Sequence, residues 1–387
     1  MTSTLIQSTA GRRAAPAEPG LSATVSGSLA AALRRSAQIE RRIGEDPRSF
    51  RILTGDRPTG ELHLGHYFGT LRNRVRLQEA GAELFVVVAD YQVLTDRDTA
   101  RTLDEHVLGL VVDYLATWID PARATIFAHS AVPELNQLLL PFLSLVSISE
   151  LGRNPTVKDE IAHSRPRSPG GAETPTDPRG MRSVNGLMFT YPVHQAADIL
   201  FGKANLVPVG ADQLPHVEVT RMIARRFAER YGPVFPVPDA LLSRAPVLLG
   251  TDGGKMSKSR GNAIAISATA DETAGLIKGA KTDSIRRVTY DPAARPEVSS
   301  LALLAALCLD RDPAEVAGEI GDGGASALKA TVTEAVNERF AAIRARRGEL
   351  AGDPGYVRRI VREGNARASE IAHSTLNEVR AAMGMTY

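Results

Sequence analysis

Short runs of Val, Ile, Leu and Phe recur through the first part of the chain, and helical patterns separate them. The runs cover residues 52–53, 84–88, 125–127, 207–209 and 247–249. Continuous apolar runs are typical of strands buried on both faces, as in a parallel sheet covered by helices. The alternation therefore predicts an α/β fold, a Rossmann-like doubly wound parallel sheet. From residue 271 onward the pattern is helical, which predicts a C-terminal all-helical domain.

These patterns divide the chain into three parts. Residues 1–48 are rich in Ala, Ser, Arg and Gly, and we expect a disordered N-terminal extension with one short helix over residues 28–43. Residues 49–265 are expected to form the Rossmann-like domain, with a helical insertion at about 133–190. Residues 266–387 are expected to form the helical domain and the C-terminal helices.

Composition is compatible with this division and excludes several classes of protein. With 387 residues, 43% hydrophobic and 23% charged, the chain is expected to be an ordinary soluble globular protein. No apolar run approaches the roughly 20 residues that span a bilayer, so no membrane association is expected. Cys308 is the only cysteine, which excludes an intrachain disulfide and a cysteine-based metal site. A reducing, cytoplasmic location is therefore expected.

Two histidines follow the first apolar run. Residues 53–66 contain a strand end, a turn rich in Gly and Pro, and the opening of a helix, with His63 and His66 at its entrance. Three positions apart, they share one helical face, and the N–H groups and dipole of a helix entrance favour an anion. Imidazoles can also donate hydrogen bonds to phosphoryl oxygens during displacement at phosphorus. The alternative interpretation is a pair of surface or capping histidines.

A second segment, residues 254–262, sets two lysines and two hydroxyl side chains among glycines on a predicted polar loop. The four residues are Lys255, Ser257, Lys258 and Ser259. Lysine is a compact charge on a flexible stem, and glycines let backbone N–H groups approach phosphate oxygens closely. Alone, such a loop is as often solvated surface. Together with the histidine segment, it indicates a polyphosphate site.

The two segments resemble the paired signatures of class I aminoacyl-tRNA synthetases, His-x-Gly-His at 63–66 and Lys-Met-Ser-Lys-Ser at 255–259. Residues 190–200 and 207–213 narrow the resemblance to the tryptophanyl-tRNA synthetases, and it extends from about residue 50 to the C-terminus. The His-Leu-Gly-His form of the first signature looks closer to a divergent, auxiliary bacterial type. Gln92 and Gln195 stand where familiar members have His and Met, which should make the indole pocket more polar. Such a pocket would alter the response to ring-substituted tryptophans or to an indole-based inhibitor.

The resemblance implies roles for individual residues. Asp198 would accept the indole N–H, since indole offers one donor and no acceptor and needs a fixed polar partner. The other tryptophan-binding residues would be Tyr191, Gln195, Gln213 and Gln92. The catalytic residues would be His63, His66, Lys255, Lys258 and Lys158.

ATP would bind to residues that follow the predicted strands. The implied set is Arg57, Pro58, Thr59, Gly65, His66, Gly210, Ala211, Asp212, Val247, Lys255, Met256, Ser257, Lys258 and Ser259. Ala211 replaces the acid of the family's Gly-Glu-Asp-Gln element, so only backbone contacts are expected there. No protein metal site is expected; Mg²⁺ would be carried by ATP.

The implied reaction is ATP-dependent activation of L-tryptophan to tryptophanyl-AMP, followed by transfer to tRNA(Trp). By the same resemblance, residues 266–387 would read the anticodon and the assembly would be a homodimer. The net charge of +2 does not indicate a general nucleic-acid or DNA binder, so tRNA contact would depend on local arginines. The candidates, which amphipathic helices could equally expose to solvent, are Arg344, Arg346, Arg347, Arg358, Arg359 and Arg362. Two alternatives remain: a tyrosyl-tRNA synthetase, and a non-charging binding or regulatory paralogue.

Overall fold

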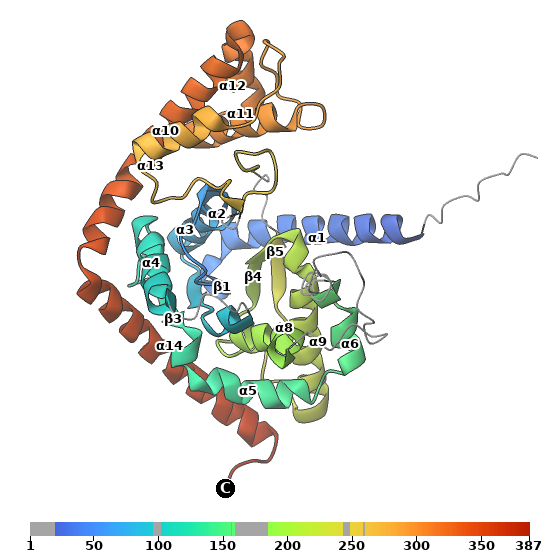
Figure 1. Cartoon of the computed structure of the whole chain (residues 1–387). Coiled ribbons are helices and arrows are strands. Elements are labelled where there is room, and N and C mark those ends of the chain that lie inside the picture. Colours follow the sequence, from blue (N-terminus) through green and yellow to red (C-terminus); the bar gives the residue numbers. More distant parts are fainter. Residues whose placement is uncertain (1–19, 96–101, 156, 159–184, 243–247, 258–259) are drawn as a thin grey trace, which may run out of the picture.

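The structure, a computed structural model, describes residues 20–95, 102–155, 157–158, 185–242, 248–257 and 260–387. Its centre is a five-stranded sheet (Figure 1). The strands are β1 (Arg51–Asp56), β2 (Glu83–Val88), β3 (Ala124–Ala128), β4 (Leu206–Val209) and β5 (Asp239–Leu242). All pair in parallel, in the order β3-β2-β1-β4-β5. The predicted doubly wound parallel sheet is confirmed.

Helices cover both faces of the sheet and form the C-terminal region. They are α1 (Gly20–Glu45), α2 (Leu64–His66), α3 (Arg72–Ala80), α4 (Leu103–Ala116), α5 (Pro133–Leu143), α6 (Ile148–Arg153), α8 (Gly186–Leu200), α9 (Leu214–Tyr231), α10 (Ala270–Gly279), α11 (Pro296–Leu309), α12 (Pro313–Ile320), α13 (Gly324–Ala351) and α14 (Pro354–Ala382). A π-helical turn, η2 (Tyr67–Leu71), joins α2 to α3. Short 3₁₀ turns are η1 (Pro47–Ser49), η3 (Tyr91–Thr95), η5 (His129–Ala131), η7 (Ala211–Gln213) and η9 (Gly321–Gly323).

Alternate strand residues enter two apolar cores, one on each face of the sheet. Ile52 and Leu84 belong to the core shared with α3, α4, α11 and α13, whereas Leu53 and Phe85 belong to the core shared with α5, α8 and α9. All but the first residue of β2 are buried, because helices cover both sides. The continuous apolar runs in the sequence therefore reflect burial on two faces.

The fifth strand differs from the prediction. Residues 239–242 form β5, whereas the predicted run at 247–249 contributes a single bridge, from Leu249 to Lys255. Val247 lies outside the described residues. Leu248 is buried, but it packs in the core that contains α11 and α13, so its apolar character serves the helical region rather than the sheet.

The N-terminal extension also differs from the prediction. Residues 20–45 form one helix, α1, which is longer than the predicted helix over residues 28–43. Residues 1–19, for which the sequence also predicts disorder, lie outside the described residues. The C-terminal half of α1 is fixed to the body because Ile39 and Ile43 are buried and the Ser36 hydroxyl accepts a hydrogen bond from the Leu242 N–H (2.9 Å). Arg35 adds an ion pair to Asp239 (2.8 Å). These contacts supply the tertiary packing that an isolated helix lacks.

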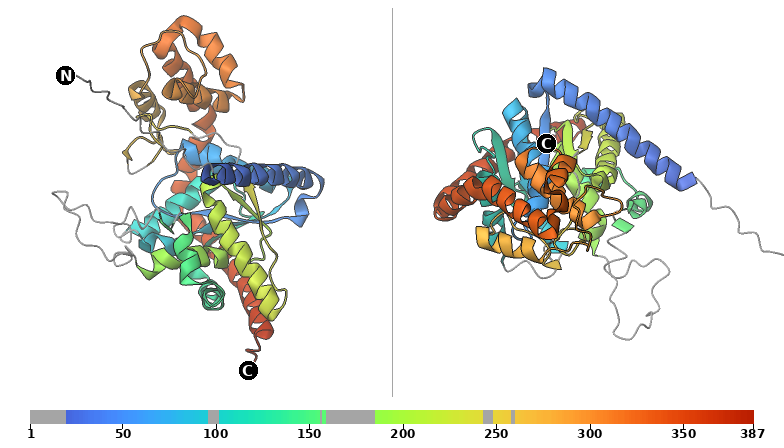
Figure 2. Two further views of the ribbon diagram at one scale, coloured as in Figure 1. Left: turned by 90° about the vertical axis from the view of Figure 1, so that its right-hand side faces the viewer. Right: turned by 90° about the horizontal axis from the view of Figure 1, so that it is seen from above.

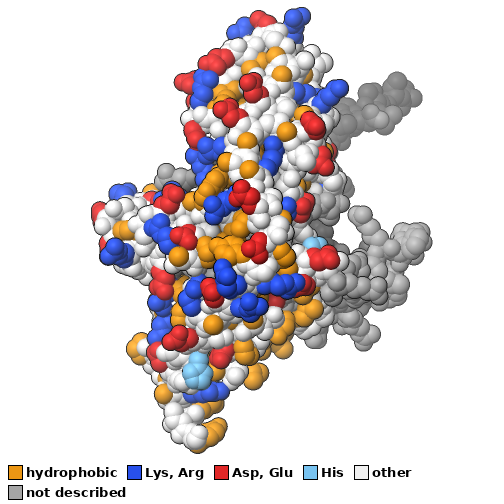
Figure 3. All heavy atoms as spheres, turned by 90° about the vertical axis from the view of Figure 1, so that its left-hand side faces the viewer, with side chains coloured by type: hydrophobic (Ala, Val, Ile, Leu, Met, Phe, Trp, Pro, Cys, Tyr) orange, Lys and Arg blue, Asp and Glu red, His pale blue; other side chains and the backbone are white. Residues whose placement is uncertain are grey.

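Helices α10 to α13 form a bundle stacked on one end of the sheet domain (Figures 1 and 2). Helix α13 leaves this bundle and runs back along the sheet domain, and α14 continues beside β3 to the C-terminus. Figure 3 looks on to the face that α4, α13 and α14 form, where Lys and Arg side chains are interspersed with Asp and Glu.

The candidate tRNA-binding arginines all lie on α13 and α14, and most have partners within the chain. Arg346 donates to the Leu115 carbonyl (2.9 Å), and Arg358 pairs with Asp104 (2.6 Å). The side chain of Arg344 donates to Asn337 and Thr273. Arg346 and Arg358 therefore hold α13 and α14 against α4, whereas Arg344 joins α13 to α10.

Candidate active site

The strand order places the candidate site between β1 and β4. Sequential strands on either side of this pair wind in opposite directions, and doubly wound sheets bind ligands beyond the carboxyl ends of the strands at such a switch point. The His63 turn follows β1, and the segment from Gly210 to Gln213 follows β4. Geometry alone thus brings two of the predicted ATP-binding segments to one edge.

Backbone hydrogen bonds hold the His63 turn from several sides. The Leu62 N–H donates to the Asp113 carboxylate of α4 (3.1 Å). The Leu62 carbonyl accepts from the Ile266 N–H (2.8 Å), and the Leu64 N–H donates to the Ile264 carbonyl (3.0 Å). Residues 264–266 immediately follow the Lys255 loop, so the two signature segments are joined by backbone pairing.

His63 and His66 lie side by side, with ring centroids 3.7 Å apart. The His63 N–H donates to His66 Nδ1 (3.2 Å), as in a capping box. Because Nδ1 accepts this hydrogen bond, the neutral His66 ring carries its proton on Nε2. Gly65 leaves room for both rings, because a Cβ atom there would lie 3.0 Å from the His63 ring and 3.4 Å from Met256 Sδ, closer than most Cβ contacts.

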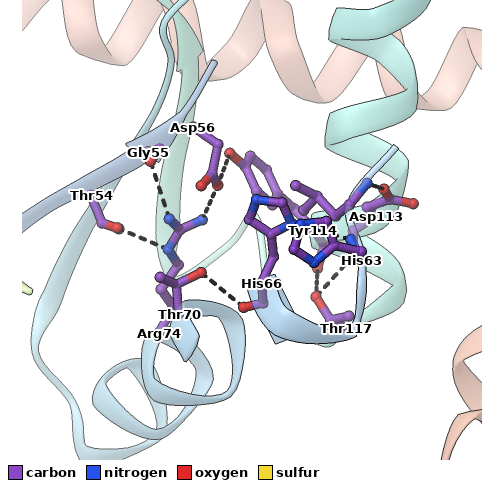
Figure 4. A network of polar contacts seen from close by, with 11 residues as sticks. Thr54, Gly55, Asp56, His63, His66, Thr70, Arg74, Asp113, Tyr114 and Thr117 are labelled. Atoms are coloured by element: carbon purple, nitrogen blue, oxygen red, sulfur yellow. Dashed lines mark hydrogen bonds and ion pairs between the residues drawn. The ribbon is translucent and has the colours of Figure 1, made fainter. Parts of the chain in front are cut away.

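A buried ionic network underlies the turn (Figure 4). The Arg74 side chain is 2% exposed and donates to Asp56 (2.6 Å) and to the Thr54 hydroxyl (2.8 Å). The Tyr114 hydroxyl donates to the same oxygen of Asp56 (2.8 Å). Burial would raise the pKa of Asp56, but Arg74 outweighs it and lowers that pKa. The end of β1 is thereby fixed to α3 and α4, which position the histidine turn.

Asp113 connects this turn to the C-terminal helices. Its side chain is 1% exposed, and Arg347 near the end of α13 donates to it (2.7 Å). Burial raises the pKa of Asp113, and Arg347 opposes that rise. One carboxylate therefore binds both the Leu62 N–H and a guanidinium from a helix that begins in the bundle.

The Lys255 loop is organised by a buried asparagine. Asn262 accepts from the Ser257 N–H (2.8 Å), and its amide donates to Asp252 (2.7 Å) and to the Lys255 carbonyl (3.1 Å). Met256 is buried, whereas the Lys255 side chain is exposed. Two further residues predicted for this loop, Lys258 and Ser259, lie outside the described residues.

The remaining predicted ATP-binding residues that the structure describes are exposed or half-buried, apart from the buried Pro58. After β4, Gly210 precedes the 3₁₀ turn that contains Ala211 and Asp212, both exposed, and Gln213, which donates to Asp212 (3.2 Å). After β1, Arg57 is exposed, Pro58 is buried and Thr59 is half-buried. The side chain of Lys158 is exposed beyond α6.

The predicted tryptophan-binding residues come from α8, from η3 and, in the case of Gln213, from η7. Tyr191, Gln195 and Asp198 are spaced by four and three positions, so they share one face of α8. Asp198 is 2% exposed, and Gln92 Nε2 lies 3.5 Å from its Oδ2 atom. The Tyr191 hydroxyl is already within 3.0 Å of the buried His216 Nε2. The structure thus brings Gln92 to Asp198 and pairs Tyr191 with another residue.

The sequence analysis missed a residue at the centre of this group. His129, directly after β3, is fully buried, and its Nδ1 atom lies 2.8 Å from Asp198 Oδ1. Burial would lower the pKa of His129, but the Asp198 and Asp90 carboxylates outweigh it and raise that pKa. The sequence could have indicated this residue, because His129 closely follows a predicted strand, where doubly wound sheets place their site residues.

Features that would indicate other kinds of site are absent from the part of the chain that the structure describes. There, no group of three or more His, Cys, Asp or Glu side chains is arranged to hold a metal ion. No helix among the described residues is long and apolar enough to cross a membrane. Cys308 is free and buried.

Known proteins share these features over most of the chain. The family described as tRNA synthetases class I (W and Y) matches residues 45–341. The chain is 41% identical over 353 residues to the tryptophan–tRNA ligase of Treponema pallidum, covering 87% of this chain and 97% of that protein. It is 40% identical over 348 residues to that of Streptococcus pyogenes serotype M1, with 87% and 98% covered.

Solved structures show the same relationship. The tryptophanyl-tRNA synthetase of Campylobacter jejuni, complexed with ADP and tryptophan, superposes with a TM-score of 0.72 at 30% identity, covering 86% of this chain and 99% of that one. The tyrosyl-tRNA synthetase of Archaeoglobus fulgidus, complexed with L-tyrosine, shares the fold with a TM-score of 0.58 at 23% identity, covering 77% and 90%.

Proposed function

This chain belongs to the tryptophanyl-tRNA synthetase family and is an aminoacyl-tRNA ligase, and from that premise we propose which residues perform its reaction. The ligase first joins tryptophan to AMP at the expense of ATP and then transfers it to tRNA. Its curated relatives favour this activity over a tyrosine-specific enzyme or a non-charging paralogue. Both signature segments are complete, as catalysis requires.

In the first step, the tryptophan carboxylate attacks the α-phosphorus of ATP, and pyrophosphate leaves. His63 and His66 donate hydrogen bonds to the phosphoryl oxygens as negative charge builds. The hydrogen bond from the His63 N–H to His66 Nδ1 supports this role, because it leaves the His66 proton on Nε2 as a donor. Mg²⁺ enters with ATP.

Lysines neutralise the leaving phosphates in this proposal. Lys255 and Lys258 hold the β- and γ-phosphates, and Lys158 approaches from the insertion. The exposure of the Lys255 side chain supports the role, since a mobile cation above an ordered loop base can close on a polyphosphate. Residues 210–213 contact the adenosine ribose and the substrate ammonium, with Asp212 and Gln213 using their side chains and Ala211 only its backbone.

Asp198 selects tryptophan by accepting its indole N–H. Burial supports this role: the carboxylate is 2% exposed, so a ring without an N–H donor would leave its Oδ2 atom without a strong hydrogen bond. Sites of this kind reject a ligand that lacks the hydrogen bond by as much as about 10⁴–10⁵. Phenylalanine is excluded in this way, and Gln195 and Gln92 line the pocket.

In the second step, the terminal ribose hydroxyl of tRNA(Trp) displaces AMP, while residues 266–387 contact the anticodon. We place the reaction in the cytoplasm, which suits a free, buried cysteine. The proposed assembly is a homodimer. Leu140 on α5 and Ile148 on α6 are 73% and 71% exposed, and a second copy of the chain would cover them.

The role of the histidines is tested by pyrophosphate exchange into ATP. His66→Asn keeps an acceptor near the position of Nδ1 but removes the Nε2 donor, and we expect kcat to fall by about 10²–10³ with little change in the KM for tryptophan. His373→Asn, at an exposed position on α14, is the matched control. Exchange at the wild-type rate in His66→Asn would show that His66 does not donate to the phosphoryl oxygens.

A further inference from the structure

A fully buried histidine faces the carboxylate that we assign to indole recognition. His129 and Asp198 are 0% and 2% exposed, and His129 Nδ1 lies 2.8 Å from Asp198 Oδ1. We infer that His129 is a positioning residue for tryptophan specificity, holding the Asp198 carboxylate in the orientation that accepts the indole N–H. The inference rests on the proposed role of Asp198 and adds a residue to it.

Neighbouring segments hold His129 in place. The next residue, Ser130, donates both its N–H (2.9 Å) and its hydroxyl to Asp90, which follows β2. The His194 ring of α8 packs against the His129 ring, with centroids 4.2 Å apart. A ring fixed in this way can hold a carboxylate in one orientation, which a long flexible side chain cannot do at the same entropic cost.

Charge explains why a histidine suits this position. Burying a carboxylate away from water is costly unless it has a polar or charged partner. The imidazole supplies a compensating charge beside it, and the carboxylates of Asp198 and Asp90 raise the pKa of His129. Burial lowers the pKa of His194, so the second histidine contributes packing rather than charge.

The two carboxylate oxygens of Asp198 are not equivalent. Oδ1 lies against His129, whereas Oδ2 is 3.5 Å from Gln92 Nε2, at the limit of a hydrogen bond. An indole N–H can displace so long a contact and gain a charge-assisted hydrogen bond. We therefore assign Oδ1 to His129 and Oδ2 to the substrate.

Two variants separate positioning from folding. His129→Leu fills the site without a donor, whereas His129→Asn puts a neutral amide donor near the position of Nδ1. Pyrophosphate exchange is measured for both with tryptophan and with β-(benzothienyl)alanine, in which sulfur replaces the indole N–H. We expect His129→Leu to raise the KM for tryptophan by about 10- to 100-fold with the KM for ATP nearly unchanged. His129→Asn should recover part of the loss.

The sulfur analogue allows the preference for tryptophan over a ligand without the indole N–H to be measured in each variant. In His129→Leu the preference for tryptophan over β-(benzothienyl)alanine should fall by about tenfold or more, because Asp198 is no longer held in the orientation that accepts the indole N–H. A KM and a preference like those of the wild type, or a loss of kcat alone, would overturn the inference. If Asp198→Ala keeps the full preference for tryptophan, the proposed function of Asp198 itself fails, which is a separate result.

Discussion

Arg347→Met tests whether the Asp113 carboxylate joins the catalytic turn to the C-terminal helices. Methionine keeps much of the aliphatic stem but removes the guanidinium that donates to Asp113 (2.7 Å). Asp113 keeps its hydrogen bond from the Leu62 N–H but becomes a buried carboxylate without a cation. The perturbation therefore acts on a group that lies directly beneath the His63 turn.

The magnitude follows from burial. Removing one partner of a buried ion pair costs about 3–5 kcal/mol. Protonation of Asp113 limits the loss, because neutralising an aspartate with a reference pKa near 3.9 costs about 4 kcal/mol at pH 7. The Arg347 side chain is 21% exposed, so solvent screens part of the pair. We expect a loss of about 2–4 kcal/mol in the free energy of unfolding.

Urea unfolding followed by circular dichroism measures this loss. Arg359→Met is the matched control, since its nearest carboxylate, Glu363, is 3.8 Å away and both side chains are more than half exposed. The control should lose less than about 1 kcal/mol. A double-mutant cycle with Asp113→Asn should show coupling of about 1–3 kcal/mol between the two positions.

The same variant should also affect catalysis. If Asp113 positions the His63 turn, Arg347→Met lowers the kcat of pyrophosphate exchange more than it changes the KM for tryptophan. A variant no less stable than Arg359→Met, with unchanged kcat, would refute the reasoning. Loss of stability without loss of kcat would show that the pair is structural only.

Three further predictions concern other parts of the chain. Lys258→Ala should lower adenylate formation by about 10²–10³ with little loss of tryptophan affinity, measured by single-turnover kinetics. Burial lowers the pKa of His216 to about 4, so the unfolded chain takes up that proton first, and stability should fall between pH 6.5 and 4 by up to about 3 kcal/mol. Urea unfolding should show a smaller decrease in His216→Gln. Replacing both Leu140 and Ile148 by Asp should convert a dimer to a monomer in light scattering, and an unchanged mass would exclude this face as the interface.

The sequence predicted the elements and residue pairs that depend only on neighbouring positions in the chain. The apolar run at 84–88 became β2 because helices bury it on both faces, and the spacing of His63 and His66 placed them together on one turn. The fifth strand was wrong because Leu248 is apolar for a different reason, packing against helices distant in sequence. An apolar residue does not indicate which partner will cover it.

The missed residues share a dependence on distant partners. His129 stands 69 positions before Asp198, and Arg347 stands 234 positions after Asp113. Neither pairing has a local spacing that a single sequence could reveal. In the sequence, Arg347 has the spacing of an exposed arginine on an amphipathic helix, which made it a candidate for RNA contact. In the structure, its side chain pairs with Asp113 of α4.

Amino-acid-dependent exchange of pyrophosphate into ATP, before any tRNA is added, tests the central claim most directly. The full chain is assayed with tryptophan, tyrosine and phenylalanine in parallel. Strong exchange with tryptophan, and none above background with the other two, is the result that we predict. Exchange with tyrosine instead, or with none of the three, would contradict the assignment of this site to tryptophan activation.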